Sequence, residues 1–333
     1  MTIKELAQIA GVSTATVSRA LNNNPGINAK TQKRILQLAE ELGYEPNLMA
    51  KGLSSQRTYT IGVLISDVTN PFYSEILRGI EDIVTQYNYT TAIINTDYDV
   101  EKERRALSLL RNGRMDGLIA YVSNRVADEC MTLVKMEYPL VMLGHLIEEL
   151  KCPKIGCNNF SSAYAATEYL IKAGHRKIAH IAGHRETKTG IQRYQGYKAA
   201  MANYDYPVDP QWVIPTDYSG HSAYENTLKF LSKHPDITAI FAANDAIAAG
   251  CYRALHESGY RIPDDISVIG HDDTEVASIL IPTLTTMQQE KRKIGRIAAQ
   301  SMFRILSTGT LKEDVIIVPT KLIERKSVKK LSE

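Results

Sequence analysis

The stretch from Gly11 to Asn22 reads GVSTATVSRALN, and it marks where one short helix ends and a second begins. Gly11 tolerates the backbone of a sharp turn, and Ser13 is suited to cap a helix that runs from Thr14 to about Leu21. Two helices joined by so short a turn must cross steeply. The stretch therefore predicts a helix-turn-helix unit near the start of the chain.

Helical patterns flank this stretch on both sides. Thr2 and Glu5 have the spacing of a capping box before the first helix, whose apolar side chains recur at helical spacing. Asn28 is suited to cap a third helix over residues 29–42, which presents one apolar face. Three short helices with apolar faces predict a small all-α domain, to which we assign residues 1–46.

The second helix carries side chains that suit the major groove of DNA, where a helix-turn-helix protein places this element. Thr14, Thr16 and Ser18 offer hydroxyls to phosphates or bases. Ala15 is small enough to approach a thymine methyl group, and Arg19 can pair with both acceptors of guanine. We expect the DNA contacts of this domain to include Thr2, Ser13, Thr14, Ala15, Thr16, Ser18, Arg19 and Asn22.

The distribution of charge supports this interpretation. The 333 residues carry 39 Lys and Arg against 37 Asp and Glu, a net charge of +2. Residues 1–59 alone hold seven basic and four acidic residues, a net of 7 − 4 = +3. Lys30, Lys33 and Arg34 are candidates for contacts to phosphate. A three-helix domain with a merely solvated basic face is the alternative to DNA binding.

Composition and cysteine pattern assign the chain to a broad class. With 44% hydrophobic and 23% charged residues it has the composition of a globular protein, and its length suggests two or three domains. Cys130, Cys152, Cys157 and Cys251 form neither a CxxC pair nor a zinc-finger pattern, so we expect free thiols and no metal site. The sequence shows neither a signal-peptide pattern nor an apolar run long enough to span a bilayer, from which we expect a cytoplasmic protein that does not bind membranes.

From Thr60 onward, short β-branched runs alternate with longer amphipathic segments, which is typical of βα units and parallel sheets. Seven runs are predicted as strands: residues 61–65, 91–95, 117–122, 140–143, 177–181, 239–242 and 267–270. Helices are predicted between them over residues 73–86, 102–112, 163–172, 192–202, 223–231 and 246–257. Two doubly wound sheets with a cleft between them fit the 274 residues from Thr60 to the end better than one large sheet.

A connector separates the two parts of the chain. Pro46 stops the third helix, residues 48–53 have the length of two helical turns, and residues 54–56 have the composition of a flexible connection. Gly52 weakens a helix by about 1 kcal/mol relative to Ala, and isolated helices this short are marginal in water. We therefore expect this segment to become helical only when a partner supports it.

Ordered motifs extend over almost the whole chain. They lie at residues 2–7, 11–22, 42–47, 61–63, 70–73, 116–119, 174–179, 241–245, 262–265 and 322–325. Together they closely resemble the LacI/GalR family of transcriptional regulators. The resemblance implies an all-α helix-turn-helix headpiece followed by an α/β domain like the periplasmic binding proteins, made of two doubly wound parallel-sheet subdomains.

The same resemblance implies domain boundaries. Residues 1–46 would form the headpiece, residues 47–59 the hinge helix and linker, and residues 60–333 the effector-binding and dimerisation domain. Within that domain one subdomain would comprise residues 60–158 and 289–320, and the other residues 159–288 and 321–333.

The resemblance also assigns DNA contacts residue by residue. Thr14, Ala15 and Arg19 fall where the base-reading side chains of the family lie. Leu53 falls on the hinge leucine that wedges into the minor groove, which kinks the duplex. Lys51 stands where many relatives carry Arg, so the charge is kept while the geometry of the contact differs.

In the regulatory domain the resemblance implies a small molecule in the cleft between the subdomains. Ligands of open α/β sheets bind at the carboxyl ends of strands. Charged and amide groups there can pair with sugar hydroxyls, and an aromatic ring can cover an apolar sugar face. The implied effector contacts are Phe72, Tyr73, Tyr121, Phe160, Thr189, Arg193, Tyr218, Asn244 and Asp272.

The effector class and the partners follow from the same comparison. Thr187 stands where purine-responsive relatives carry an additional arginine, and together with Asn244 this favours a carbohydrate or sugar phosphate over a nucleobase. We therefore expect a homodimeric repressor of carbohydrate-utilisation genes that binds a pseudo-palindromic operator and uses no cofactor. Induction and corepression by the effector are both open.

Three alternatives remain to be weighed: an enzyme, a transport-type binding protein and, within the same family, a catabolite-control regulator. The adjacent Asp272 and Asp273 would suit acid–base catalysis, but the sequence has no phosphate-binding loop, nucleophile elbow or metal-ligand cluster, so we predict that the chain is not an enzyme. A transport-type binding protein is disfavoured by the missing signal peptide and the basic headpiece. At residues 57–58 and 72–75 the chain also resembles catabolite-control regulators, whose corepressor is a phosphorylated carrier protein. However, the arginine that this subgroup carries before Pro282 is replaced by Ile281, so a phosphoserine would lose a charge-assisted hydrogen bond.

Overall fold

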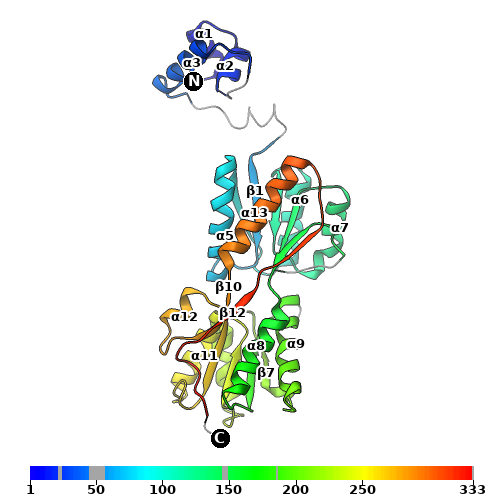
Figure 1. Cartoon of the computed structure of the whole chain (residues 1–333), viewed down its shortest axis with the longest axis vertical. Helices are drawn as coiled ribbons and strands as arrows, with labels where there is room; N and C mark the ends of the chain where they lie inside the picture. The colour runs from blue at the N-terminus through cyan, green and yellow to red at the C-terminus, as the bar shows by residue number, and fades with distance from the viewer. Residues whose placement is uncertain (22–24, 45–56, 145–148, 185–186, 332–333) are drawn as a thin grey trace. The chain divides into compact units, whose positions relative to one another are not determined.

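The structure is a computed structural model that describes residues 1–21, 25–44, 57–144, 149–184 and 187–331 (Figure 1). It divides into two compact units, Met1–Thr58 and Tyr59–Glu333. Three of the residues predicted to contact DNA, Asn22, Lys51 and Leu53, lie outside the described residues.

The described part of the first unit contains helices α1 (Ile3–Ala10), α2 (Thr14–Leu21) and α3 (Ala29–Glu41). The capping box forms as the sequence predicts: the Thr2 amide donates to Glu5 Oε2 at 2.7 Å, and the Glu5 amide donates to Thr2 Oγ1 at 3.3 Å. Gly11 ends α1 with a φ of 61°, in the left-handed region that favours glycine. The predicted helix-turn-helix is therefore confirmed.

The core of this first unit is small. Leu6, Val17 and Ile35 are fully buried where the three helices meet. The other buried members of this core are Ala7, Ala10, Ala20 and Ala39. Since hydrophobic stabilisation scales with the apolar area buried, the fold of this unit depends on a few large side chains.

The described part of the second unit forms two six-stranded sheets, each in a separate lobe (Figure 1). The first sheet has the order β11-β5-β4-β3-β1-β2 and is entirely parallel. Its strands are β1 (Thr60–Ile65), β2 (Thr90–Asn95), β3 (Gly117–Ala120), β4 (Leu140–Leu143), β5 (Pro153–Gly156) and β11 (Asp314–Ile317). The inner strands β1, β3 and β4 are nearly continuous buried apolar runs because helices cover both faces.

The second sheet has the order β12-β10-β9-β8-β6-β7 and is parallel except for β12. Its strands are β6 (Ile178–Ala182), β7 (Val213–Pro215), β8 (Ala239–Ala242), β9 (Ser267–Asp272), β10 (Thr285–Gln289) and β12 (Thr320–Ile323). Sequential βα units and two separate sheets confirm the doubly wound architecture that the sequence predicts.

Helices pack on both faces of each sheet. In the first lobe, α5 (Pro71–Val84) and α13 (Lys291–Thr308) cover one face, and α6 (Val100–Arg111) and α7 (Ala127–Lys135) cover the other. The second lobe has α10 and α11 on one face and α8 and α9 on the other. Their bounds are α8 (Asn159–Lys172), α9 (Lys188–Asn203), α10 (Gly220–Leu231) and α11 (Asp245–Glu257), and the short α12 (Glu275–Ile279) follows β9.

The chain passes between the lobes three times, from β5 to α8, from β10 to α13 and from β11 to β12. The sequence analysis did not predict strands β5, β7, β10, β11 and β12 or helices α7 and α13. These strands are three to five residues long. Such short runs are too weak to identify by periodicity alone.

Candidate functional site

Helix α2 presents the predicted reading side chains to solvent. Val17 and Ala20 face the core, whereas Thr14, Ala15 and Arg19 are exposed. This separation follows from the helical repeat, which places the two apolar side chains on one face and the polar side chains on the other. The exposed face is available to a base edge in a groove.

The hydroxyls at the start of α2 are already engaged. Ser13 Oγ accepts from the Thr16 amide at 3.2 Å and lies 2.8 Å from Thr16 Oγ1. Thr2 is likewise held by its capping box. Ser13, Thr16 and Thr2 therefore shape the helix ends, and each hydroxyl has only part of its hydrogen-bonding capacity left for DNA.

The basic residues of the headpiece have different roles in the structure. Lys30 and Lys33 are exposed on α3. The Arg34 guanidinium instead donates from Nη2 to the carbonyl oxygen of Ala10 at 2.7 Å, at the C-terminal end of α1. Arg34 thus ties α3 to α1, a role that the sequence analysis missed.

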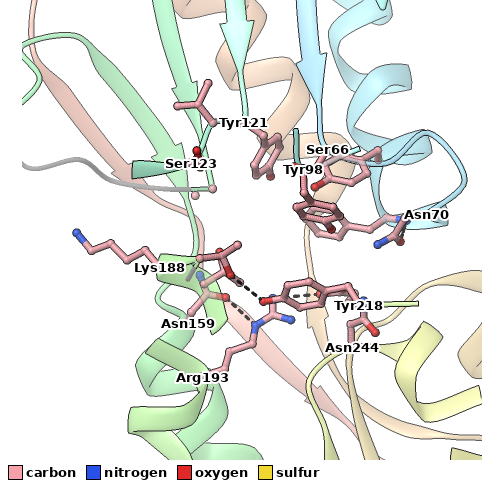
Figure 2. Close-up of a pocket in the computed structure, with 18 of the residues that line it drawn as sticks. Ser66, Asn70, Tyr98, Tyr121, Ser123, Asn159, Lys188, Arg193, Tyr218 and Asn244 are labelled. Carbon is pink, nitrogen blue, oxygen red and sulfur yellow. Dashed lines mark hydrogen bonds and ion pairs between the residues drawn. The ribbon is translucent and has the colours of Figure 1, made fainter. Parts of the chain in front are cut away.

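A cavity lies between the two lobes of the second unit, at the carboxyl ends of their strands, and encloses about 870 Å³, part of it open to solvent. Figure 2 shows Ser66, Tyr98 and Tyr121 on one side of this space, facing Arg193, Tyr218 and Asn244 on the other. Parallel strands end at the same edge of a sheet, so each lobe contributes side chains from several loops.

Eight of the nine predicted effector contacts line this cavity: Phe72, Tyr73, Tyr121, Thr189, Arg193, Tyr218, Asn244 and Asp272. Phe160 is not among the lining residues of the described chain. It lies in the first turn of α8 with 40% of its surface exposed. The structure therefore brings eight of the nine together, and effector binding by any of them stays a prediction.

Aromatic rings form much of the wall. Tyr73 contacts Phe72 and Tyr121 edge-on, with ring centroids 5.2 and 5.3 Å apart. Tyr98 of the first lobe stacks on Tyr218 of the second with a centroid distance of 6.3 Å. Burial raises the pKa of Tyr73 to about 12, so its phenol stays protonated and can donate. The wall offers both apolar faces and hydroxyl donors.

A buried polar group occupies the second lobe beside these rings; we call Asn159, Arg193, His271, Asp272 and Gln289 the cleft cluster. Arg193 Nε donates to Asn159 Oδ1 at 2.9 Å, Nη1 donates to the Ala243 carbonyl oxygen, and Nη2 lies 3.3 Å from Asp272 Oδ1. Both charged side chains are only 5% exposed. Each charge is therefore compensated by the other, as burial requires.

The charges of this pair reinforce each other. Burial alone would raise the pKa of Asp272, but Arg193 and His271 outweigh it and hold that pKa below its ordinary value. Burial opposes the charge of Arg193 too, and Asp272 restores it and raises the pKa of the guanidinium. Both groups remain ionised at neutral pH and offer charge-assisted hydrogen bonds.

Asn244 has two roles in the structure. Its Oδ1 caps α11 by accepting from the Ile247 amide at 2.8 Å, and its side chain also lines the cavity. The helix-capping alternative and the ligand-contact alternative are thus compatible, because the capping bond uses the oxygen and leaves the amide NH₂ group.

Sequence reasoning missed several lining residues. Tyr98 follows β2, Ser123 follows β3, and Gln289 ends β10. Glu103 on α6 is buried, and its carboxylate accepts from the Ser123 hydroxyl at 2.6 Å and from the Ser123 amide at 3.1 Å. Applying the strand-end rule to every predicted strand would have found Tyr98 and Ser123. Nothing local in the sequence indicates Glu103.

The candidate metal-binding and acid–base side chains can be located in the described chain. No group of three or more His, Cys, Asp or Glu side chains there could hold a metal ion. The two adjacent carboxylates diverge: Asp272 faces the cavity, whereas Asp273 pairs with Arg325 at 2.7 Å and accepts from Gln288 at 2.9 Å. In the described chain, every helix is too short or too polar to cross a membrane.

Comparison with known proteins identifies the family. Residues 2–47 match the bacterial regulatory proteins of the lacI family, and residues 167–328 match the periplasmic binding protein-like domain. The chain is 35% identical over 327 residues to the HTH-type transcriptional regulator RegA of Clostridium saccharobutylicum, with 98% of each chain covered. The chain belongs to the lacI family. It is therefore a DNA-binding transcriptional regulator.

Other relatives of this lacI-family regulator carry different names. It is 35% identical to the HTH-type transcriptional repressor PurR of Photobacterium profundum, with 99% of each chain covered. It is 33% identical to catabolite control protein A of Priestia megaterium, again with 99% of each chain covered. Similar overall identity to both proteins means that the alignment alone does not choose the effector.

Solved structures of the family confirm the predicted fold class. The lac repressor dimer bound to operator and the anti-inducer ONPF is 28% identical, covers 99% of each chain and superposes with a TM-score of 0.86. A LacI family regulator from Enterococcus faecium with bound ribose is 30% identical, covers 82% of this chain and 100% of that one, and has a TM-score of 0.73. Membership of this family removes the transport-type binding protein as an alternative.

Proposed function

We propose that this lacI-family regulator is a homodimeric repressor of carbohydrate-utilisation genes, which binds a pseudo-palindromic operator and responds to a sugar or sugar phosphate in the cleft. The observation that carries the proposal is the cavity itself, where aromatic rings of both lobes surround a buried Arg193–Asp272 pair. Aromatic faces with charge-assisted hydrogen bonds are what a sugar ring with several hydroxyls requires. The ribose-bound and operator-bound structures of relatives support the same assignment.

The proposed DNA contacts follow from the exposed face of α2. Arg19 and Ala15 would read bases, Thr14 and Ser18 would contact bases or phosphates, and Lys30 would contact phosphate. Two headpieces related by a two-fold axis would occupy half-sites about 34 Å apart, which requires a dimer. Because the proposed partner is operator DNA, we infer that the protein acts in the cytoplasm.

The proposed allosteric mechanism uses the division into 1–46, 47–59 and 60–333. Ligand in the cleft would change the angle between the two lobes and so the separation of the two connectors, of which Leu53 would enter the minor groove. Ligand and operator would then be coupled by about 1–3 kcal/mol, which corresponds to 5- to 150-fold in affinity. Linkage requires that each changes the affinity of the other by the same factor.

We propose that the cleft binds its ligand without chemical change. The two carboxylates that might act in acid–base catalysis are engaged, one with Arg193 and the other with Arg325. A sugar effector is also preferred over a phosphoprotein corepressor. Ile281, where that subgroup would carry arginine, is 92% exposed and offers no charge to a phosphate.

The test begins with purified full-length protein and a random DNA pool, from which bound sequences are selected. We expect a pseudo-palindromic consensus. A thermal-shift screen of monosaccharides, disaccharides and their phosphates then finds the effector, because a ligand at 100 times its Kd stabilises by about 2.7 kcal/mol. The active sugar should change operator affinity in a fluorescence anisotropy titration and be recovered unaltered. Selection of no DNA consensus, or a stabilising sugar that leaves operator affinity unchanged, would contradict the proposal.

A further inference from the structure

His271 is a buried histidine that neither the proposed DNA surface nor the lining of the cavity uses. It is the second-last residue of β9, an inner strand between β8 and β10, and none of its surface is exposed. Both ring nitrogens have partners. Nδ1 lies 2.9 Å from Asp272 Oδ1, and Nε2 lies 2.8 Å from Ser162 Oγ on α8.

The direction of these hydrogen bonds follows from the charges. Burial, reinforced by Arg193, lowers the pKa of His271 to about 4, so the ring is neutral at physiological pH. An ionised carboxylate only accepts, so the hydrogen must be on Nδ1. Nε2 is then an acceptor and takes the Ser162 hydroxyl hydrogen, whose other contact, the Asn159 carbonyl oxygen, is farther away at 3.2 Å.

The two oxygens of Asp272 are in different environments. Oδ1 accepts from His271 Nδ1 at 2.9 Å, Gln289 Nε2 at 2.7 Å and Arg193 Nη2 at 3.3 Å. None of the hydrogen bonds of the described chain reaches Oδ2. Among the described residues, His180 Nε2 is the one fully buried side-chain nitrogen or oxygen without a hydrogen-bond partner. Asp272 Oδ2 also has no partner, so it cannot be fully buried. Oδ2 therefore faces the cavity as an open acceptor.

The backbone of Asp272 has an unusual conformation that neighbouring side chains must support. Its φ of 110° lies in a region that residues other than glycine rarely adopt. Lys291 Nζ supports this backbone by donating to the carbonyl oxygens of Asp272 at 2.5 Å and Asp273 at 2.8 Å. The direction of the carboxylate is set separately, by the three donors on Oδ1.

We propose that His271 is a positioning residue of the effector site: a relay from Ser162 through the neutral ring of His271 holds Asp272 Oδ1, so that Oδ2 meets a hydroxyl of the effector. This inference rests on the proposed function, because it assigns Asp272 a ligand. The relay joins α8 to the end of β9, and Arg193 from α9 completes the fixation. The effector itself touches Asp272 and not His271.

Two substitutions at this position separate positioning from packing. His271→Phe keeps a flat ring of similar size but removes both hydrogen bonds. His271→Asn keeps a donor near the position of Nδ1, so it should restore the bond to Asp272. Ser162→Ala removes only the outer hydroxyl and allows the ring hydrogen to move to Nε2.

The first measurement needs no effector. Side-chain ¹⁵N NMR of the full-length protein should show a neutral His271 with its hydrogen on Nδ1, and ¹³C NMR should show a higher pKa for Asp272 in His271→Phe than in the wild type. A hydrogen on Nε2, or an unchanged Asp272 pKa, would overturn the relay even if no sugar bound. These outcomes are independent of whether the cleft takes a carbohydrate.

The second measurement is calorimetric titration with D-ribose, D-glucose, D-galactose and cellobiose. For the sugar that binds, His271→Phe should weaken affinity by about 10- to 100-fold and Ser162→Ala by about 3- to 10-fold, whereas His271→Asn should recover most of it. Wild-type affinity in His271→Phe would overturn the inference while leaving the proposed function intact. Failure of all four sugars would count against the proposed effector class alone.

His175 provides a matched control. It is also a buried histidine of the second lobe with both ring nitrogens engaged, Nδ1 with Thr238 Oγ1 at 3.1 Å and Nε2 with the Lys329 carbonyl oxygen at 3.1 Å. It does not line the cavity. His175→Phe should therefore lower stability and leave sugar affinity unchanged, and an equal loss of affinity in both variants would show that His271→Phe acts through stability.

Discussion

The face of α2 and the cleft cluster are both polar, but they differ in how much of the fold each requires. On α2, Thr14, Ala15 and Arg19 come from one helical turn and a half and are exposed to solvent. In the cleft cluster, Arg193 and Asp272 are 79 residues apart in sequence and almost wholly buried. A surface for DNA needs only a helix with one free face. A site that desolvates a sugar needs charges compensated in advance by the tertiary structure.

The largest difference between the two regions should appear on removing a core side chain of the headpiece. Leu6→Ala should cost about 2–5 kcal/mol of headpiece unfolding free energy, because Leu6 is fully buried in a core whose other members are mostly alanines. Operator binding should be lost, while thermal stabilisation by the active sugar is kept. Leu36→Ala, at a leucine that is 44% exposed on α3, should change stability by less than about 0.5 kcal/mol. Joint loss of both activities in Leu6→Ala would mean that the units do not fold separately.

Removing the charge of Asp272 in the cleft should have the opposite effect, with sugar binding weakened and operator binding kept. Asp272→Asn leaves Arg193 buried without its counter-charge, so effector affinity should fall by about 2–5 kcal/mol. Operator affinity without effector should stay within about twofold of the wild type. Asp264→Asn, at an exposed carboxylate of the same lobe, serves as the control in calorimetric and anisotropy titrations. If sugar still changes the operator affinity of Asp272→Asn, the effector site does not include Asp272.

Acid should affect the second unit through its buried histidines, whereas residues 1–59 contain no histidine. Burial lowers the pKa of His180 from 6.5 to about 4. The folded state thus binds this proton more weakly than the unfolded state, so the contribution is present above pH 6.5 and is lost as pH falls from 6.5 to about 4. At 1.36 kcal/mol per pH unit, the loss reaches about 3 kcal/mol.

The measurement is the unfolding free energy of the full chain in urea at several pH values. His180→Phe should flatten the decline below pH 6.5, because Phe fits between Tyr197 and Phe241 and carries no titratable nitrogen. At neutral pH it removes the hydrogen bond between Nδ1 and the Phe241 carbonyl oxygen at 3.0 Å but also the buried Nε2, which has no partner in the described chain, so the net cost should be about 1 kcal/mol. An unchanged pH profile would show that other groups cause the acid sensitivity.

The smallest effect should come from the exposed reading face. Arg19→Ala should weaken binding to the selected operator by about 1–3 kcal/mol and relax the preference at one base position. The affinity of the DNA-free protein for the sugar should not change, because Arg19 and the cleft lie in different units. Arg105→Ala, at an exposed arginine of α6, is the matched control. Equal weakening of specific and random DNA by Arg19→Ala would assign Arg19 to phosphate instead of a base.

Prediction from the sequence was most successful for local features. The capping box of Thr2 and Glu5, the turn at Gly11 and the cap at Asn28 all form as predicted, because each depends on residues within four positions. Apolar runs also identified β1, β3, β4, β6, β8 and β9, which are the inner strands of the two sheets apart from β5 and β10. The short strands β5, β7 and β11 were missed, because their pairing with distant strands compensates for weak local patterns.

For the cleft, resemblance to a family supplied the names of residues and the tertiary structure supplied their environment. Arg193 and Asp272 are visible in the sequence, but their pairing is not. The pairing of His271 is likewise not visible in the sequence, where it is one polar residue of a predicted strand. Its role is indicated only by the fold, in which α8 places Ser162 Oγ 2.8 Å from His271 Nε2. Phe160 shows the opposite case, since the family resemblance put it among the expected contacts while α8 leaves it 40% exposed.

The amino-acid sequence by itself determined the helix-turn-helix, the two series of βα units and the chemical character of α2, because short-range hydrogen bonds and apolar periodicity set these features. Only the tertiary structure decided which oxygen of Asp272 is held and which is open to the cavity. That choice depends on donors from β9, β10 and α9. Hydrogen bonds form only between atoms that are close in space, and the fold brings these donors together although they are far apart along the chain.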